Sequence, residues 1–236
     1  MNQEQKTKFP EPFYYLVFKI NASEDVKLRS LFTELKSFFE NFPVLRWAGW
    51  DFKLGTGANY SIDLEGIEHI DASKRIRVFE NGGLLVQGAL NSNFLCWGGG
   101  QEWDEAGKSK KIHSLALIEF TYSSFVALQR ILQDVENPHS IQAEIGFVGI
   151  NNEFSLRYNK IGSGIISFEE TFINKGSNFT STFSVDDLSN ENLPVTVYSV
   201  IEKIYRMFGL DGTKIPYTKE VLRRNMIDIQ QIKDIK

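Results

Sequence analysis

The feature that most constrains the fold is an Asn-Gly pair between two β-rich runs. The runs are Arg-Ile-Arg-Val-Phe-Glu at residues 75–80 and Gly-Leu-Leu-Val-Gln at residues 83–87, and Asn81-Gly82 separates them. Asn-Gly tolerates the positive φ angles of a type I′ turn, which closes a two-residue hairpin. The sequence therefore predicts a β-hairpin here, and with it an antiparallel sheet.

The chain before this hairpin reads as strand, helix and strand. Residues 13–20 are almost wholly apolar, which is typical of a central strand. A helix is expected from a cap at residues 21–23 to Pro43, because apolar side chains recur there at helical spacing. Alternation over residues 45–54 predicts another strand. Residues 55–74 are expected to be irregular, and residues 93–97 to form a further strand.

The second half predicts helix, two hairpins and helix. Residues 113–135 carry apolar side chains at helical spacing. Hairpins are predicted for residues 141–150 with 153–158, and for residues 165–174 with 178–185. A last helix is expected at residues 195–208, with Pro194 in its first turn and Gly209 after its end. A short charged helix is expected from Thr218 onward.

These elements define a fold class. Strands and helices do not alternate throughout, so a doubly wound parallel sheet is disfavoured. We predict an α+β fold in which antiparallel β-hairpins pack against two long helices and a C-terminal helix. With 236 residues the chain can bury a sizeable core. A single domain over residues 1–236 is expected, with 13–100 and 112–210 as candidate halves and 1–12 and 211–236 as tails.

Charge and cysteine content limit the location and the partners. The net charge of −4 gives no support for a nucleic-acid partner, because phosphate binding needs clustered Lys and Arg. Cys96 is the single cysteine, so no disulfide can form within the chain. The N-terminus is polar, and no run of 18 apolar residues occurs. We expect a cytoplasmic protein that binds no membrane.

No residue pattern predicts a catalytic centre. Cys96 could act as a nucleophile with His113 or His69 as its base. No basic residue adjoins it, however, so a small buried apolar side chain is the better interpretation. His69, His113 and His139 lack metal-ligand spacing, and Gly98-Gly-Gly100 lacks the Lys-Ser/Thr sequel of a P-loop. The sequence therefore predicts no catalytic residue, no metal and no cofactor.

One enzymatic alternative stays open. Carboxylates and a lysine on neighbouring hairpins can hold a metal ion and a water molecule, as in nucleases. Asp51 and Lys53 share a predicted strand face, and Asp63, Glu65 or Glu80 could complete such a site. Acid-x-Lys strings are common by chance, which makes this the weaker hypothesis.

The polar loop of residues 98–111 is the expected binding segment. Long loops between well-defined elements often carry function, and tryptophan is a frequent anchor of interfaces. The alternative for Trp103 is that it folds back on the body. The candidate binding residues are Trp103, Lys108, Lys110, Lys111, Trp97 and Trp50.

Residues 75–158 also resemble part of a known type of bacterial protein. Their order is a hairpin with Phe-Glu-Asn-Gly, a polar loop, an Ile-His-Ser-Leu-Ala-Leu-Ile-Glu-Phe-Thr-Tyr helix, and then strands. This order resembles the accessory region that follows the Schlafen-type AlbA-like domain. No AlbA-like domain precedes it here, so the resemblance carries over no activity. It implies a bacterial accessory module in defence or nucleic-acid regulation.

We therefore expect a non-catalytic binding or interaction module with a protein partner. It would act as a subunit or regulator of a bacterial assembly. A metal-dependent nuclease or nucleotide-processing enzyme is one alternative. A small-ligand sensor that uses the Trp- and Gly-rich loop region is the other.

Overall fold

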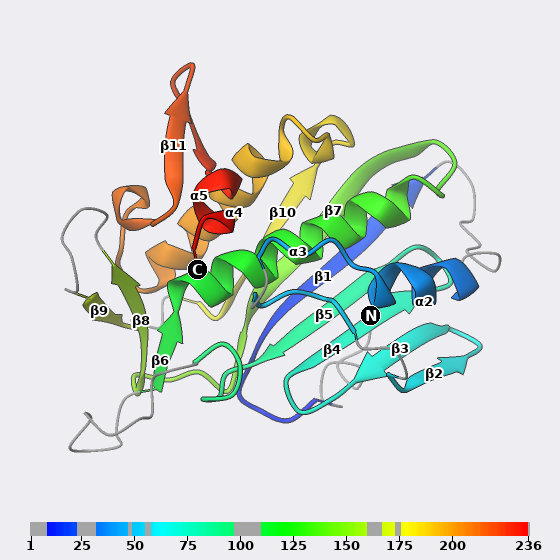
Figure 1. Cartoon of the computed structure of the whole chain (residues 1–236), viewed down its shortest axis with the longest axis horizontal. Helices are drawn as coiled ribbons and strands as arrows, with labels where there is room; N and C mark the ends of the chain where they lie inside the picture. The colour runs from blue at the N-terminus through cyan, green and yellow to red at the C-terminus, as the bar shows by residue number, and fades with distance from the viewer. Residues whose placement is uncertain are drawn as a thin grey trace.

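A seven-stranded antiparallel sheet forms the body of the protein (Figure 1). The computed structural model describes residues 9–22, 32–46, 49–54, 58–96, 110–159, 167–172 and 176–235. The sheet has the order β10-β7-β1-β5-β4-β3-β2. Its strands are β1 (Phe13–Ala22), β2 (Tyr60–Asp63), β3 (Gly66–Ile70), β4 (Lys74–Phe79), β5 (Leu84–Ala89), β7 (Pro138–Val148) and β10 (Asn178–Phe183). This sheet and its helices confirm the predicted α+β class.

Two smaller sheets and four helices complete the described part. The three-stranded sheet has the order β6-β8-β9, with β6 parallel to β8, and β11 pairs with β12. These strands are β6 (Lys110–His113), β8 (Phe154–Asn159), β9 (Ser167–Thr171), β11 (Thr218–Val221) and β12 (Arg224–Ile227). The helices are α2 (Phe32–Glu40), α3 (Ser114–Leu132), α4 (Leu193–Met207) and α5 (Ile229–Lys233), with 3-10 turns η2 (Asp186–Leu188) and η3 (Gly212–Lys214).

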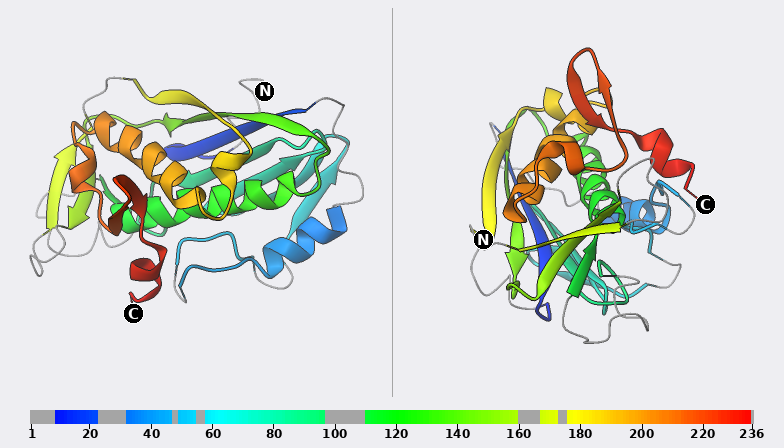
Figure 2. Two further views of the ribbon diagram at one scale, coloured as in Figure 1. Left: turned by 90° about the horizontal axis from the view of Figure 1, so that it is seen from above. Right: turned by 90° about the vertical axis from the view of Figure 1, so that its left-hand side faces the viewer.

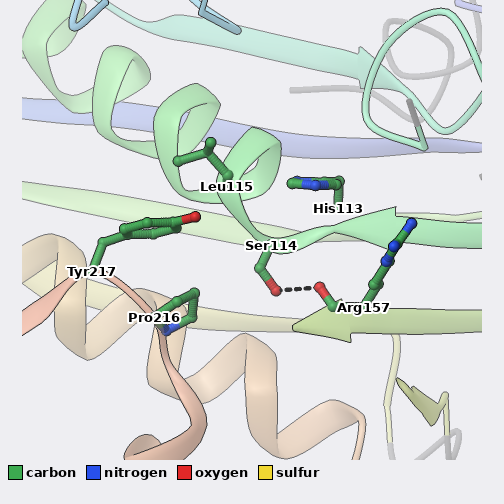
Figure 3. Close-up of a pocket in the computed structure, with 6 residues that line it drawn as sticks. All are labelled: His113, Ser114, Leu115, Arg157, Pro216 and Tyr217. Carbon is green, nitrogen blue, oxygen red and sulfur yellow. Dashed lines mark hydrogen bonds between the residues drawn. The ribbon is translucent and has the colours of Figure 1, made fainter. Parts of the chain in front are cut away.

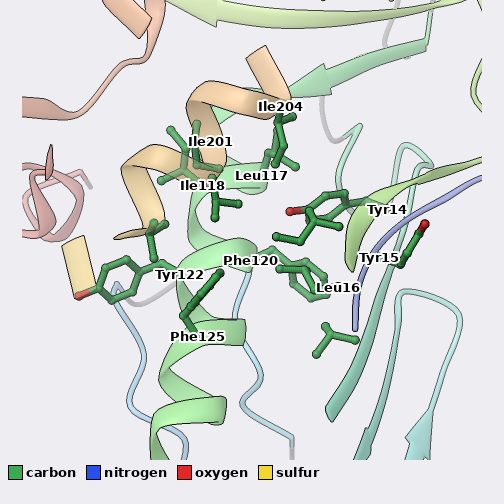
Figure 4. Packing of buried hydrophobic residues seen from close by; sticks show 14 of the residues in the cluster. Tyr14, Tyr15, Leu16, Leu117, Ile118, Phe120, Tyr122, Phe125, Ile201 and Ile204 are labelled. Atoms are coloured by element: carbon green, nitrogen blue, oxygen red, sulfur yellow. The ribbon is translucent and has the colours of Figure 1, made fainter. Parts of the chain in front are cut away.

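Helix α3 crosses one face of the large sheet, with α2 and α4 on the same side (Figure 2). On β1, Tyr14, Leu16 and Phe18 alternate toward this helix and are fully buried. Phe18 packs edge to face on Phe125 of α3, with ring centroids 5.0 Å apart. Figure 4 shows Ile201 of α4 closing the other side of α3. The core is therefore a sheet–helix–helix sandwich.

Helix α3 is long and apolar enough, by length and composition, to cross a membrane. Nearly all of it is buried inside the fold. Two of its hydroxyls bond within the helix: Thr121 donates to the Leu117 carbonyl at 2.7 Å and lies 3.0 Å from the Tyr14 hydroxyl, and Ser124 donates to the Phe120 carbonyl at 2.8 Å. It is therefore the core helix of this fold.

The sheet face opposite α3 carries a buried ion-pair network. Arg75 on β4 is 1% exposed, and its Nε donates to Glu68 Oε1 on β3 at 2.8 Å. Its Nη1 donates to Gln87 on β5 at 3.1 Å. Arg77 binds both Asp63 oxygens at 2.8 Å. Charged side chains at this depth persist because each finds a partner.

The hairpin of β4 and β5 confirms the prediction, but its turn is not type I′. The Gly82 N–H donates to the Phe79 carbonyl at 3.0 Å, and the Phe79 N–H donates to the Gly83 carbonyl at 2.8 Å. Gly82 has φ +79°, whereas Asn81 is not in the positive-φ region. The turn is therefore a type I turn followed by a left-handed glycine, which forms a bulge.

The predicted strand at residues 45–54 is wrong for the described residues 45–46 and 49–54, which are irregular. Phe52 in this segment is fully buried, with its ring 5.4 Å from that of Phe120. The Leu54 N–H donates to the Phe39 carbonyl on α2. The segment of residues 49–54 thus packs against α2 and α3 and does not pair as a strand. The expectation of irregular chain at 55–74 is also wrong, because β2 and β3 form a hairpin there.

Predicted partnerships between other strands are corrected as well. Residues 91–96 form a turn and not a strand. β7 and β8 do not form a hairpin: β7 pairs with β1 and β10, and β8 pairs with β6 and β9. β9 and β10 likewise belong to different sheets. Neighbours in sequence are separated because β7 finds a longer pairing with the central strand β1.

Near the C-terminus one helix is confirmed and one is replaced. α4 matches the predicted helix, with a proline in its first turn and Gly209 at φ +73° after it. The predicted helix from Thr218 is wrong, because β11 and β12 form a hairpin there. The short α5 follows, capped by the Asp228 side chain, which accepts from the Gln231 N–H.

Candidate functional site

The predicted binding residues fall in two groups. Trp97, Trp103 and Lys108 lie outside the described residues. The described ones are Lys110 and Lys111 on β6, together with Trp50. Trp50 lies beside His113 at the end of β6, with the two rings stacked at 5.8 Å between centroids and 18° between planes. The structure thus brings Trp50 close to the end of the predicted binding loop.

Three side-chain contacts position the partly buried Trp50. The Arg46 guanidinium lies over the Trp50 ring, 5.1 Å from its centroid. The indole Nε1 donates to the Phe94 carbonyl at 2.9 Å. Arg46, Trp50 and His113 therefore form one ordered stack.

Glu119 of α3 forms hydrogen bonds to two residues of this stack. It is 1% exposed, and it accepts hydrogen bonds from the Trp50 backbone N–H at 2.8 Å and from the Arg46 guanidinium. Burial raises the pKa of Glu119, although these two donors oppose the rise. A Cβ at Gly49 would lie 2.9 Å from the carboxylate, so a larger residue there would require Glu119 to move.

A small pocket opens next to the stack, at the start of α3 (Figure 3). Tyr217 and Pro216 face the first turn of the helix, and Arg157 extends from β8 on the His113 side. The lining residues are His113, Ser114, Leu115, Arg157, Pro216 and Tyr217. Three separate parts of the chain therefore contribute to one concave site.

The Ser114 hydroxyl has a structural role in this pocket. It donates to the Arg157 carbonyl at 2.5 Å and accepts from the Tyr205 hydroxyl at 2.8 Å. Both bonds tie α3 to β8 and α4. A nucleophilic serine needs a base that takes its proton, whereas this proton is bound to a backbone oxygen.

The charges in the pocket favour an anion. Burial, with smaller contributions from the neighbouring Arg157 and Arg46, lowers the pKa of His113 to about 4, so the ring is neutral at pH 7. Its Nδ1 is buried and has no hydrogen-bond partner among the described residues. Among the side chains that the structure describes, none forms an ion pair with Arg157. The pocket lining thus combines an arginine with a neutral imidazole.

The other candidate chemistry is not assembled here. Cys96 is buried as predicted, and burial raises the pKa of its thiol to about 12, although Lys110 opposes the rise. His69 binds Asp71, with 3.0 Å between Nε2 and Oδ2. A reactive thiolate is therefore disfavoured at Cys96.

The acids of the nuclease alternative lie apart. Asp51 is near Lys74, whose Nζ donates to the Asp51 carbonyl at 3.0 Å. Asp63 and Glu65 instead bind Arg77, which belongs to the opposite face of the sheet. Within the described ranges, no group of three or more His, Cys, Asp or Glu side chains could hold a metal ion.

Sequence reasoning named Trp50 and missed the residues around it. Arg46, Glu119, Arg157 and Tyr217 come from four distant segments, and none carries a recognisable motif. A usable signal was the single acid inside the apolar stripe of α3, since a buried carboxylate requires a partner.

Comparison of the chain with protein-family models, with curated proteins and with solved structures found no match.

Proposed function

We propose that this protein is a non-catalytic binding module, acting in the cytoplasm as a subunit or regulator of a bacterial assembly. It holds an acidic group of a protein partner in the pocket between His113, Arg157 and Tyr217. The observation that carries this proposal is that Arg157 lines the pocket beside His113 and forms no ion pair with a side chain that the structure describes. A carboxylate would gain a charge-assisted hydrogen bond there.

Binding is favoured over catalysis by the state of the reactive groups. The Ser114 hydroxyl is hydrogen-bonded on both sides, and the Cys96 thiol is buried with a raised pKa. The low pKa of His113 makes it a weak base near neutral pH. The pocket has room for about one water-sized group, at about 10 Å³, and is lined by Arg157 and the Tyr217 ring, which supports contact with a single polar group and not the enclosure of a substrate.

The test compares two arginines. Wild-type protein, Arg157→Ala and the control Arg206→Ala are used to capture partners from native extract. Arg206 lies on α4, is 66% exposed and pairs with Glu202 within its own helix. A stoichiometric protein partner should bind wild type and the control, and Arg157→Ala should weaken its affinity about tenfold or more, as removal of a charged hydrogen bond does.

Two outcomes contradict the proposal. Equal capture by Arg157→Ala and wild type would show that the pocket does not contact the partner. Product release from a nucleotide panel with divalent metal, by wild-type protein, would favour the nuclease alternative.

The same pocket supports the small-ligand sensor as the second candidate. A free carboxylate or phosphate compound would use Arg157 in the same way as a protein side chain. Such a compound should raise the unfolding temperature of wild-type protein and not that of Arg157→Ala, because ligand binding stabilises only the state that binds it.

A further inference from the structure

The β11–β12 hairpin carries an exposed apolar tip. It stands away from the body in both Figure 1 and the right-hand view of Figure 2. Every residue from 219 to 225 is exposed, and Leu222 in the turn is 92% exposed. Val221 beside it is also exposed. Large apolar side chains on a projecting element are candidates for contact with another surface.

The tip is also basic, in contrast to the acidic chain. Lys219, Arg223 and Arg224 surround the apolar pair, with Glu220 as the one acid of the hairpin strands and turn, whereas the whole chain has a net charge of −4. Lys219 pairs with Asp228 at the hairpin base, at 3.2 Å. Within the described ranges, Arg223 and Arg224 form no ion pair. The tip thus presents two uncompensated cations beside leucine.

The turn itself is built from unfavourable residues. Leu222 has φ +51° and Arg223 has φ +64°, so both central positions are left-handed, as in a type I′ turn. Asn-Gly would adopt this backbone at little cost, whereas leucine and arginine rarely do. Strained backbone of this kind is found where the side chains serve a function. Stability of the hairpin therefore does not explain why these two residues occupy its turn.

We propose that the β11–β12 tip binds the surface of a membrane that contains anionic lipids, with Val221 and Leu222 in the interfacial layer and Arg223 and Arg224 on lipid phosphates. The small apolar area of the tip favours a membrane surface over a protein partner. Two apolar side chains cover far less than the roughly 800 Å² per partner of a stable protein interface. Peripheral membrane contact needs only a few apolar and basic groups. This goes beyond the proposed pocket function and revises the expectation of no membrane partner.

The experiment is cosedimentation with vesicles of phosphatidylcholine, alone or mixed with phosphatidylglycerol. Wild-type protein should bind the mixed vesicles, and binding should fall as salt rises. Replacing Arg223 and Arg224 by Gln should weaken binding about 25-fold, since each basic group contributes about fivefold near an anionic surface. Leu222→Asp should abolish binding to the mixed vesicles. The matched control is Leu64→Asp in the β2–β3 turn, where leucine is 95% exposed, and it should bind like wild type.

A second variant separates function from folding. The double change Leu222→Asn, Arg223→Gly supplies the preferred type I′ residues, so the hairpin should be retained while vesicle binding is lost. Arg157→Ala should bind vesicles normally, so a failure of the pocket function is distinguishable. The proposal is overturned by absent vesicle binding, by equal binding to neutral vesicles, by equal loss in Leu64→Asp, or by preferential binding to duplex DNA.

Discussion

The β2–β3 and β11–β12 hairpins each expose a leucine at the turn, yet they are built in opposite ways. β2–β3 is the edge of the seven-stranded sheet. Its turn is tied down by Asp63, whose Oδ1 accepts from the N–H groups of Glu65 at 2.9 Å and Gly66 at 3.0 Å. Arg77 then clamps the same carboxylate to the sheet. Leu64 is exposed at the outside of a turn whose backbone is held by the Asp63 carboxylate.

β11–β12 has no such anchoring at its tip. It is a separate two-stranded sheet, joined to the body at its base, where the Asp228 N–H donates to the Tyr217 carbonyl at 2.7 Å. Its turn places Leu222 and Arg223 in the left-handed region. The comparison teaches that an exposed leucine says little by itself. An exposed leucine in a strained, left-handed backbone conformation points to a function more strongly than an exposed leucine in an unstrained turn.

The largest expected loss of stability comes from removing the Glu68 carboxylate on β3, which pairs with Arg75. Glu68→Ala leaves Arg75, 1% exposed, with a buried charge that has lost its carboxylate. We expect the free energy of unfolding to fall by about 3–5 kcal/mol, measured by urea denaturation. The control Glu65→Ala removes a 63% exposed partner of Arg77 and should cost less than about 1 kcal/mol. Equal losses would mean that depth of burial does not set the strength of this network.

A gain in stability is expected at the other hairpin. Changing Leu222 to Asn and Arg223 to Gly relieves two left-handed positions and should raise the free energy of unfolding by about 1 kcal/mol or more. Thermal unfolding is the measurement. Leu64→Asn, at the turn without positive φ, should change stability by less than about 0.5 kcal/mol. A destabilised double variant would show that the two side chains make contacts that hold the hairpin.

Acid should lower the free energy of unfolding through Asp71, which follows β3. Burial raises the pKa of Asp71, at the turn after β3, but hydrogen bonds from His69 and from the backbone N–H groups of Lys74 and Ser73 outweigh it and lower the pKa to about 2. Because the folded pKa lies below the unfolded value near 4, the stabilisation is present above pH 4 and lost as pH falls toward 2.

Comparing wild type with Asp71→Asn tests this. The side chain is 42% exposed, so screening limits the difference in unfolding free energy to about 1 kcal/mol at pH 7. The difference should shrink toward zero near pH 2. A difference that is constant with pH would assign the effect to the lost hydrogen bonds alone.

Local signals predicted the elements whose cause is local. The hairpin of β4 and β5 carries its own turn residues, and α3 and α4 carry apolar stripes with recognisable ends. β2 was missed because its Tyr-Ser-Ile-Asp run is short and polar, and its strand form depends on pairing with β3. The predicted β7–β8 hairpin failed because pairing with β1, more than a hundred residues earlier, is longer.

The candidate site was harder to predict for the same reason. Trp50 was named as a candidate binding residue, but its environment depends on the Glu119 carboxylate, which accepts a hydrogen bond from the Trp50 N–H in an irregular segment. Tyr217 enters the pocket through a left-handed backbone that no composition rule predicts. Pockets of this kind form where distant segments of the chain come together. A single sequence shows the residues but not which of them lie close together in the fold.

The central place of β1 has a consequence for synthesis of the protein. β1 is paired on one side with β5 and on the other with β7, which leaves the ribosome more than a hundred residues later. At about 5–20 residues per second, the apolar run of β1 waits roughly 10 s for its second neighbour. During that interval its edge is open to other nascent chains, so the yield of native protein should depend on chaperones that shield the N-terminal region until β7 has been translated.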